Sequence, residues 1–565
     1  MARLARPLDT RASRYDVIVV GSGYGGGVAA SRLARSGKRV CLIERGREIL
    51  TGEFPARFPE MRGEMQVTGR ALSFGKPTGL FDVRLGEDMH VLVACGLGGG
   101  SLVNAGVALR PDPRVFLDEV WPGQIRQDGL VDEGYARAAR WLRPAYHARA
   151  RDMTKFKAFD AASPALGRTA VNPPVVVSFE PNVNPAGIAQ PGCTLCGDCC
   201  AGCNVGAKNT VALTYLPDAV RHGAHVFTEL RVAHVAKAAD GAWRVTAERL
   251  DAGQASHGVA REVHFEAPMV ILAAGTLGST EILLRSRARG LGVSDRLGRR
   301  FSANGDIIAF GYGAKLPVDA IGVGHPSKIE GHEVGAAVTG QIDIEDAATL
   351  DNEMHIQEGA MPSAMAPILP VMFVPNGRLL GALSSLVNGV YKGPLASLQT
   401  FFAVSHDSAS GQFRLDDGRL VLSWPGARDE AVYNRLDAAL SALVAKAGGA
   451  YVKNPLAGSV MGHQPATAHP LGGCGMGREV GDGVVDHKGR VFAAGPGGGS
   501  ADVHDGLYVI DGSIVPRSLG VNPLLTITAL AERALIHMAA DYGLTFDDAP
   551  AASGVPLSPA SPRAE

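Results

Sequence analysis

The sequence predicts a Rossmann-like α/β domain, made from three separated pieces of the chain, with a second, α+β domain inserted between them. Three observations lead to this prediction. A strand–glycine–helix–strand unit opens the chain between Tyr15 and Glu44, and a second strand–glycine–helix junction follows the apolar run Met269 to Ala273. Glycine-rich sequence then returns at Ala466, after a long stretch of different character. Strands and helices that alternate in this way are typical of a parallel sheet covered by helices.

The opening unit contains a dinucleotide-binding motif. The β-branched run Val17 to Val20 leads directly into Gly21-x-Gly23-x-x-Gly26. The first glycine permits a tight turn, the second lets the backbone approach a pyrophosphate, and the third lets the helix pack on the strand. The unpaired N–H groups at the N-terminus of that helix favour phosphate binding.

The rest of the unit completes the motif. Val28 to Ser36 has helical composition and ends at Gly37, and Val40 to Ile43 is a second strand. Glu44 follows that strand, eighteen residues past Gly26, where a carboxylate can accept hydrogen bonds from a ribose 2′-OH. Strand, glycines, helix, strand and acid in one unit indicate a bound nucleotide in preference to a plain tight turn.

Composition excludes several classes of function. The chain has 565 residues, enough for two or three domains. Charged residues make up 20% and the formal net charge is −1, so nucleic acid or an anionic membrane surface is not expected as a partner. No apolar run is long enough for a transmembrane segment, and the basic N-terminus lacks the apolar part of a secretory signal.

Five of the eight cysteines fall between Cys193 and Cys203. This clustering favours a reducing, cytoplasmic location and a local role over a disulfide framework. The leading hypothesis is an iron–sulfur cluster, because four cysteines have the ferredoxin spacing C-x2-C-x2-C-x3-C: Cys193, Cys196, Cys199 and Cys203. The match is incomplete, because Asn204 replaces the proline usual in ferredoxins and no second motif of this kind occurs in the sequence. A zinc–thiolate site and plain thiols or disulfides remain open alternatives.

The order of these patterns predicts the domain organisation. Residues 1–14 are expected to be a flexible leader and residues 548–565, rich in Ala, Pro and Ser, a disordered tail. The nucleotide-binding domain is expected from 15–125, 193–303 and 463–545, and the substrate-binding domain from 126–192 and 304–462. Further expected elements are strands at His225–Ala236, Trp243–Leu250, Ile307–Phe310 and Ala336–Thr339, and helices at Arg378–Tyr391 and Glu430–Ala447.

Several stretches resemble the glucose–methanol–choline (GMC) family of flavoprotein oxidoreductases. The opening unit, GLGGGSLVNAG at 96–106, the segment 275–286 and Val521-Asn522-Pro523 are similar to the family's FAD-contacting segments. HPLGGC at 469–474 and LYVIDGSIVPRSLGVNP at 507–523 resemble the cholesterol oxidase-like branch. The likeness is weakest over residues 310–450. It implies an FAD-binding, Rossmann-like domain with an inserted substrate domain.

The resemblance also implies how FAD is bound. Several family members anchor FAD covalently through a histidine near the second glycine loop, where this chain reads VNAG at 103–106, so we expect non-covalent FAD. The backbone of Val232 is expected at the adenine and Asp511 at the ribityl chain. The other implied FAD-binding residues are Gly21, Gly23, Tyr24, Gly26, Glu44, Gly98, Gly99, Ser101, Asn104, Gly512, Asn522 and Pro523.

His469 and Asn522 match the family's catalytic pair. Oxidation of an alcohol sends a hydride to the flavin and a proton to a protein group. A histidine suits the proton because its ordinary pKa is about 6.5, and an asparagine can hold the alcohol oxygen. Without the resemblance, a lone histidine before proline is more simply interpreted as a structural residue.

Glu358 is the third candidate catalytic residue. In cholesterol oxidases a similarly placed glutamate shifts a double bond after oxidation. The apolar neighbours in HIQEGAMPSAMAP would raise the pKa of a carboxyl, as this task requires. The alternative is a structural glutamate in a pocket wall.

These patterns together predict FAD-dependent oxidation of a hydrophobic secondary alcohol, with a 3β-hydroxysteroid as one candidate substrate. The electron acceptor is expected to be oxygen, or a protein or quinone. One alternative is a dehydrogenase for another apolar alcohol that passes electrons through an iron–sulfur centre. The other is a flavin-binding protein without turnover.

Overall fold

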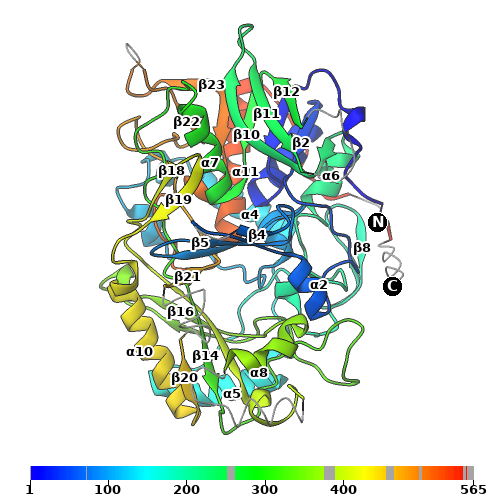
Figure 1. The fold of residues 1–565 in the computed structure, drawn as a ribbon, viewed down its shortest axis with the longest axis vertical. Helices are drawn as coiled ribbons and strands as arrows, with labels where there is room; N and C mark the ends of the chain where they lie inside the picture. Colours follow the sequence, from blue (N-terminus) through cyan, green and yellow to red (C-terminus); the bar gives the residue numbers. More distant parts are fainter. Residues whose placement is uncertain are drawn as a thin grey trace.

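Two large sheets lie at opposite ends of the molecule, and the chain crosses between them several times (Figure 1). The computed structural model describes residues 2–70, 73–250, 261–373, 389–453, 464–495, 499–551 and 555–556. The first sheet has six strands in the order β22-β23-β13-β1-β2-β9. In chain order these are β1 (Val17–Val20), β2 (Val40–Ile43), β9 (His225–Phe227), β13 (Met269–Leu272), β22 (Arg490–Phe492) and β23 (Val503–Val509).

The six-stranded sheet is parallel except for β22, and β1 lies between β2 and β13. All residues of β1, β2 and β13 are buried, as expected for parallel strands covered on both faces. From β1 the chain continues to β2 and β9 on one side and later returns to β13 and β23 on the other side, so the strand order reverses at β1. Ligands of open α/β sheets bind at the carboxyl ends of the strands at such a point.

Helix α1 (Tyr24–Arg35) begins four residues earlier than the sequence predicted. Gly25, Gly26 and Gly27 precede the predicted helix and have low helix propensity, but they lie in the first turn of α1. A Cβ at Gly25 would collide with the carbonyl oxygen of Ile510, and one at Gly26 with that of Gly21. Close packing of α1 on neighbouring backbone therefore overrides propensity here.

Helices α4 (Leu130–Leu142), α6 (Tyr215–Arg221) and α11 (Leu524–Tyr542) pack with α1 in one apolar core. Arg32 in α1 and Glu532 in α11 form a fully buried ion pair, with Nε–Oε2 at 3.0 Å and Nη2–Oε1 at 2.5 Å. The sequence assigned α4 to the substrate-binding part, but α4 lies against α11 (Figure 1).

The strand predicted over His225–Ala236 is divided between two sheets. Glu229 adopts a left-handed conformation with φ of 60°, and at this point the chain leaves the six-stranded sheet. It then forms an antiparallel sheet of β10 (Leu230–Lys237), β11 (Trp243–Arg249) and β12 (Glu262–Ala267). Helix α7 (Gly275–Arg287) follows β13, as predicted.

The second large sheet is antiparallel, with the order β15-β16-β17-β14-β20. Its strands are β14 (Ile307–Tyr312), β15 (Gln341–Ile344), β16 (Met354–Gly359), β17 (Gln399–Ser405) and β20 (Ala450–Val452), and helices α5 (Thr154–Ala162) and α10 (Ala431–Lys446) lie beside it. The predicted strand Ala336–Thr339 is wrong, because its apolar residues enter a small core and the N–H of Thr339 bonds the Glu358 carboxylate. Most of the predicted helix Arg378–Tyr391 lies outside the described residues.

A third sheet, with the order β21-β6-β5-β3-β4, lies between the two ends (Figure 1). It consists of β3 (Met65–Thr68), β4 (Ser73–Gly75), β5 (Phe81–Leu85), β6 (His90–Ala94) and β21 (Ala466–Thr467). The smaller elements are α2 (Phe58–Gly63), α3 (Gln124–Gln127), α8 (Leu369–Met372), β7 (Asn182–Val183), β8 (Ile188–Gln190), β18 (Gln412–Asp416), β19 (Arg419–Ser423) and β24 (Val555–Pro556). Among the described helices, none combines the length and apolar character needed to cross a bilayer.

Both predicted flexible ends contact the body of the protein. The N–H groups of Leu4 and Ala5 donate to the Glu48 carboxylate at 2.7 and 3.0 Å. The Arg35 guanidinium donates to the carbonyls of Asp547 and Ala549, and β24 pairs with β8. Apart from β24, the predicted tail beyond residue 551 lies outside the described residues.

We expect Gly134→Ala to lower the melting temperature, because its Cβ would collide with the Ala529 carbonyl and force α4 away from α11. Overpacking of this kind costs about 1–3 kcal/mol, more than the ~1 kcal/mol that alanine gains over glycine in a helix. Gly63→Ala in α2 is the matched control, since a Cβ there meets nothing within 4 Å. Equal melting temperatures for the two variants would contradict the observed packing of α4.

Candidate functional site

Loops from separate pieces of the chain meet at the carboxyl ends of β1, β2 and β13. Gly21 has φ of +95°, and a Cβ there would collide with the Ala273 carbonyl. A Cβ at Gly99 would lie 2.8 Å from the Cα of Gly23, so the second glycine loop touches the first. A Cβ at Gly23 itself would meet nothing within 4 Å. The N-terminus of α1 therefore faces free space that a pyrophosphate can occupy.

Glu44 is fixed at the end of β2. Its buried carboxylate accepts hydrogen bonds from Ser22 Oγ at 2.5 Å, Gly46 N at 2.8 Å and Ser22 N at 3.1 Å. Ser22 Oγ also accepts from Gly98 N at 2.9 Å, which joins both glycine loops to this acid. The two carboxylate oxygens of Glu44 still have lone pairs that can accept a hydrogen bond from a ribose hydroxyl.

Asn104 presents an unsatisfied polar atom to the same region. Its Nδ2 donates to Tyr24 Oη at 2.7 Å, while its buried Oδ1 has no hydrogen-bond partner within the described structure. Buried polar atoms are nearly always bonded, so this atom fits a site for a bound polar group. Ser101 has a different role, because its Oγ donates to Gly98 O and accepts from Val211 N and so holds the shape of the loop.

Asp511 lies at the adjacent turn, before the short 3-10 helix Gly512–Ile514. Its carboxylate accepts from Ser279 Oγ at 2.5 Å and from the N–H groups of Gly275 and Ser513 at 2.8 Å. Burial raises the pKa of the Asp511 carboxyl, and these hydrogen bonds oppose the rise. Pro523 caps α11, and Val232 lies where β10 shifts its register with β11.

A single turn, 304–306, holds the segments that carry His469 and Asn522. Asn304 donates from Nδ2 to the carbonyl of Val521 at 2.8 Å, directly before Asn522. Asp306 lies 3.2 Å from His469 Nδ1, although the geometry falls short of a hydrogen bond. Since Asp306 also accepts from Ala468 N at 2.7 Å, the turn fixes the residue directly before each member of the predicted pair, His469 and Asn522.

Asn522 forms a buried amide pair with Gln357 of β16. Gln357 Nε2 donates to Asn522 Oδ1 at 2.6 Å, and Asn522 Nδ2 donates back at 3.3 Å. Gln357 Nε2 also bonds Gln341 Oε1 at 2.9 Å, and Gln341 Nε2 donates to Asp343 at 2.5 Å. A carboxylate only accepts hydrogen bonds, so Asp343 sets the direction of this chain. Within the described part of the chain Asn522 Nδ2 makes no other hydrogen bond, so its second hydrogen can bond a ligand.

Glu358 does not join this site. Side chains alternate along a strand, so Glu358 points to the face of β16 opposite Gln357 and Asn522. Its carboxylate accepts from the fully buried Lys155 Nζ at 2.8 Å and from Thr339 N at 2.8 Å. The sequence-based role of Glu358 as a proton-transferring residue is therefore unsupported by its position, and the glutamate is a partner of Lys155.

The predicted metal-binding cysteines lie on one loop, in which Cys199 is buried and the other three are half-buried. Burial is the main cause that raises the pKa of Cys193, and the charges of Cys199, Cys203 and Cys196 raise it further, so these three thiols lie within electrostatic reach of Cys193. Burial raises the pKa of the Cys196 thiol to about 12, which is unlike a reactive nucleophilic thiol. No three cysteine sulfurs among the described residues gather within 4.8 Å. The loop therefore lacks the close sulfur spacing that a single zinc ion requires.

Asp128, His487 and His537 are the one group of potential metal ligands that does gather within 4.8 Å in the described part of the chain. The guanidinium of Arg533 donates to Asp128 and lies 3.0 Å from His487 Nδ1. A cation already occupies this cluster, so it is a structural ion-pair network.

Sequence reasoning missed Asp306 and Gln357. No motif marks Asp306, which lies just before the segment least similar to the family. Alternation in β16 shows that only one of Gln357 and Glu358 can face Asn522, but the local pattern does not say which.

Family models account for more than half of the chain. The GMC oxidoreductase model for the N-terminal part matches residues 15–304, and that for the C-terminal part matches residues 450–531. The chain belongs to the GMC oxidoreductase family. Members of this family bind FAD and oxidise alcohols, so the chain is an oxidoreductase that acts on CH–OH groups.

Relatives of this GMC oxidoreductase include enzymes for apolar alcohols. It is 28% identical to the cholesterol oxidase of Mycobacterium tuberculosis, over 92% of this chain and 90% of that protein. It is 28% identical to the cholesterol oxidase of Acinetobacter baumannii, over 94% and 95%. A long-chain-alcohol oxidase of Arabidopsis thaliana is 24% identical over 92% of this chain and 66% of that protein.

Solved structures support the fold. The pyridoxine 4-oxidase from Mesorbium loti aligns with a TM-score of 0.57 at 19% identity, over 93% of this chain and 99% of that one. A fungal aryl-alcohol oxidase aligns with a TM-score of 0.59 at 15% identity, over 94% and 100%. The predicted family and fold class, a Rossmann-like FAD-binding domain with an added substrate domain, are thus confirmed.

We expect Glu358→Gln to destabilise the protein, because Lys155 would remain buried and charged without its partner. Breaking a buried ion pair costs about 3–5 kcal/mol, measurable as a lower urea midpoint. The double variant Lys155→Met/Glu358→Leu should lose less, since it removes both charges. Unchanged stability of Glu358→Gln would show that the pair is not structural.

Proposed function

We propose that this GMC oxidoreductase uses FAD to oxidise an apolar secondary alcohol, with His469 and Asn522 as catalytic residues. The observation that carries the proposal is the turn 304–306, which holds Val521 through Asn304 and places Asp306 beside His469. One turn thereby positions the two segments that match the family's catalytic pair. The Asn522 side chain is further held by Gln357, and the backbone next to His469 is held by Asp306 and Thr467.

The residues around the crevice fit FAD. In this proposal Gly21, Gly23, Tyr24, Gly26 and Glu44 bind the adenosine diphosphate half, with Val232 at the adenine. The unsatisfied Oδ1 of Asn104 and the open space at Gly23 support a bound polar cofactor. The remaining FAD-binding residues proposed are Gly98, Gly99, Ser101, Asp511, Gly512, Asn522 and Pro523.

FAD, when bound, supplies the acceptor for the hydride of the alcohol carbon. His469 accepts the hydroxyl proton, directly or through water, as a general base. Asn522 donates its free Nδ2 hydrogen to the alcohol oxygen and so orients the carbon. Gln357 supports this step, because it bonds Asn522 Oδ1 at 2.6 Å and fixes which end of the amide faces the substrate.

The names of the relatives, cholesterol oxidase and long-chain-alcohol oxidase, support an apolar alcohol as the substrate class. A 3β-hydroxysteroid is the narrower proposal. We do not extend it to double-bond isomerisation, because the residue of β16 that contacts Asn522 is the amide of Gln357, which is not a base at neutral pH.

Each turnover leaves two electrons for an acceptor. Oxygen can take them and form hydrogen peroxide, as the oxidase names of the relatives suggest. The alternative is a protein or quinone acceptor reached through a metal centre on Cys193, Cys196, Cys199 and Cys203. A flavin-binding protein without turnover is the weaker alternative, because the segments that carry His469 and Asn522 are both held in place.

We expect acid precipitation to release FAD into the supernatant, since VNAG at 103–106 offers no histidine for a covalent link. The supernatant is analysed by absorbance and mass spectrometry. Yellow colour that stays in the pellet would contradict non-covalent binding. Colourless protein that cannot be reconstituted with FAD would contradict the cofactor assignment.

We expect His469→Ala and Asn522→Ala to keep FAD but to slow its reduction by the alcohol roughly 10²–10⁴-fold, the usual contribution of a general acid–base group. Anaerobic stopped-flow bleaching against sterols and aliphatic alcohols measures this rate and identifies the substrate. Wild-type rates in either variant would remove that residue from the mechanism.

The neighbouring positions of β16 provide a matched control for that experiment. Gln357→Leu should slow reduction by about tenfold, the effect of one lost buried hydrogen bond of ~1.4 kcal/mol. Glu358→Gln, assayed where it is folded, should reduce at the wild-type rate.

A further inference from the structure

Lys208 is a buried lysine that has no acidic partner among the described residues. The residue is 1% exposed, and its Nζ donates to the carbonyls of Asn104 at 2.6 Å, Cys199 at 3.1 Å and Leu102 at 3.2 Å. No carboxylate in the described part of the chain forms an ion pair with it. Buried charges are normally paired, since carbonyl dipoles alone compensate the loss of water incompletely.

Lys155 shows how the same fold treats a comparable lysine. It is also 1% exposed, yet its Nζ lies 2.8 Å from both carboxylate oxygens of Glu358. One buried lysine near the cysteine loop is therefore neutralised by an acid and the other is not. The contrast indicates that a negative group which is not an Asp or Glu belongs beside Lys208.

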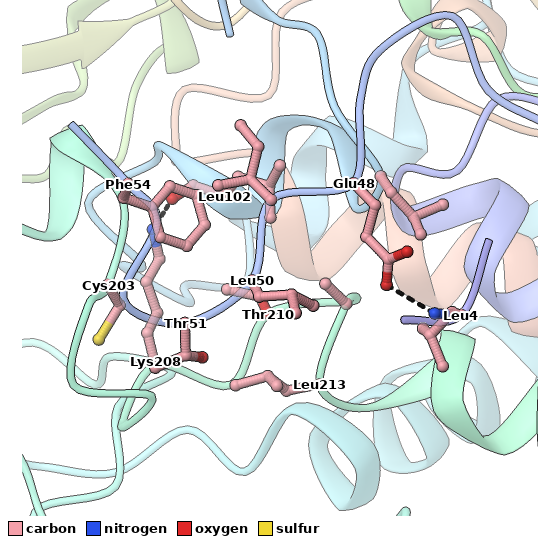
Figure 2. Close-up of a pocket in the computed structure, with 13 residues that line it drawn as sticks. Leu4, Glu48, Leu50, Thr51, Phe54, Leu102, Cys203, Lys208, Thr210 and Leu213 are labelled. Atoms are coloured by element: carbon pink, nitrogen blue, oxygen red, sulfur yellow. Dashed lines mark hydrogen bonds between the residues drawn. The ribbon is translucent and has the colours of Figure 1, made fainter. Parts of the chain in front are cut away.

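The cysteine loop lies next to Lys208. Figure 2 shows Lys208 reaching the carbonyl of Leu102 in a pocket that Cys203 also lines. Four thiolates around a metal centre carry more negative charge than the metal ions neutralise. Such a centre would supply the missing counter-charge.

The loop is held in shape from several sides. Leu195, between Cys193 and Cys196, has φ of 57°, and its N–H donates to Cys193 Sγ at 3.4 Å. Hydrogen bonds to sulfur are one means by which proteins tune iron–sulfur clusters. Asn204, which departs from the ferredoxin proline, accepts from Gly52 N and Phe54 N and fixes the other end of the loop.

The spacing of the sulfurs favours a cluster over zinc. Thiolates bound to one zinc ion lie about 2.3 Å from it, and so within about 4 Å of each other. No three cysteine sulfurs lie within 4.8 Å in the described structure. An iron–sulfur cluster keeps its cysteines farther apart because several iron and sulfide ions lie between them.

We infer that Cys193, Cys196, Cys199 and Cys203 hold an iron–sulfur cluster and that Lys208 is its built-in counter-charge. Lys208 also connects the cysteine loop, at Cys199, to the second glycine loop, at Leu102 and Asn104. Lys208 would then contact both the loop that holds the cluster and the loop proposed to bind the flavin. This inference depends on the proposed function only for the source of the electrons.

The first experiment measures metal in the intact protein. Protein purified without oxygen is assayed for iron, acid-labile sulfide, zinc and flavin, and metal-poor preparations are incubated with ferrous iron and sulfide. We expect iron and sulfide in addition to flavin, and their loss with retained flavin in Cys196→Ser. Stoichiometric zinc without sulfide, or no uptake of iron, overturns the cluster.

The second experiment tests Lys208 through the cluster's potential. Lys208→Met should bind less iron, or show a more negative midpoint potential, because loss of a nearby positive charge favours the oxidised cluster. Lys208→Arg keeps the positive charge and should bind as much iron as the wild-type protein. It is the variant that is measured if Lys208→Met does not fold. Unchanged iron and potential in Lys208→Met, or no iron in Lys208→Arg, overturns the role of Lys208.

Lys328→Met is the matched control. Lys328 also donates to backbone carbonyls, those of Ala56 and Ser363, but it is exposed. Lys328→Met should have the iron content and midpoint potential of the wild-type protein. A change equal to that of Lys208→Met would also overturn the inference. Anaerobic bleaching of the flavin by alcohol is followed in parallel. If alcohol bleaches the flavin of a protein that contains no iron, the cluster is overturned and the proposed alcohol oxidation stands. If the protein contains iron and sulfide but alcohol does not bleach the flavin, the proposed oxidation is contradicted and the cluster stands.

Discussion

The structure depends on how closely separate segments of backbone approach one another at the carboxyl edge of the six-stranded sheet. A Cβ at Gly21 or Gly25 would collide with the carbonyls of Ala273 and Ile510, which follow β13 and β23. Because these contacts leave no room for side chains, the three pieces of the nucleotide-binding part pack in a fixed arrangement. That arrangement surrounds the open N-terminus of α1 with Glu44 and Asp511. The proposed cofactor site thus follows from the packing of glycines that are far apart in the sequence.

The sequence predicted well those features in which each residue carries its own signal. The strands Val17–Val20 and Val40–Ile43 and the helix after Gly275 form as expected, because apolar runs and glycines there report burial and turns directly. Features that depend on partners elsewhere were missed. Gln357 and Glu358 differ in role only because β15 and β17 fix which face of β16 meets Asn522. The contact of α4 with α11 likewise depends on residues some 400 positions away.

Buried charge distinguishes structural from functional polar groups in this protein. Arg32 has Glu532 and Lys155 has Glu358, so each pair is complete within the fold. Removing one partner would be costly, yet neither pair needs anything from outside. Among the described residues Lys208 has no acidic partner and Asn104 Oδ1 has no hydrogen-bond partner, and hydrogen bonds connect both residues between Tyr24 and Cys199. Buried polar groups are normally bonded, so these two residues support the ligand sites proposed above.

The proposed catalytic pair, His469 and Asn522, lies where the two parts of the protein meet. The turn 304–306 begins the segment that the family models leave unmatched, yet it holds Val521 and lies beside His469. Gln357, deep within that segment, bonds Asn522 directly. Substrate specificity can therefore diverge through residues 310–450 only while these few contacts are kept. Because Asp343 sets the direction of the amide chain that ends at Asn522, a change at the outer edge of the second sheet can reach the proposed reaction centre without altering any residue that touches the substrate.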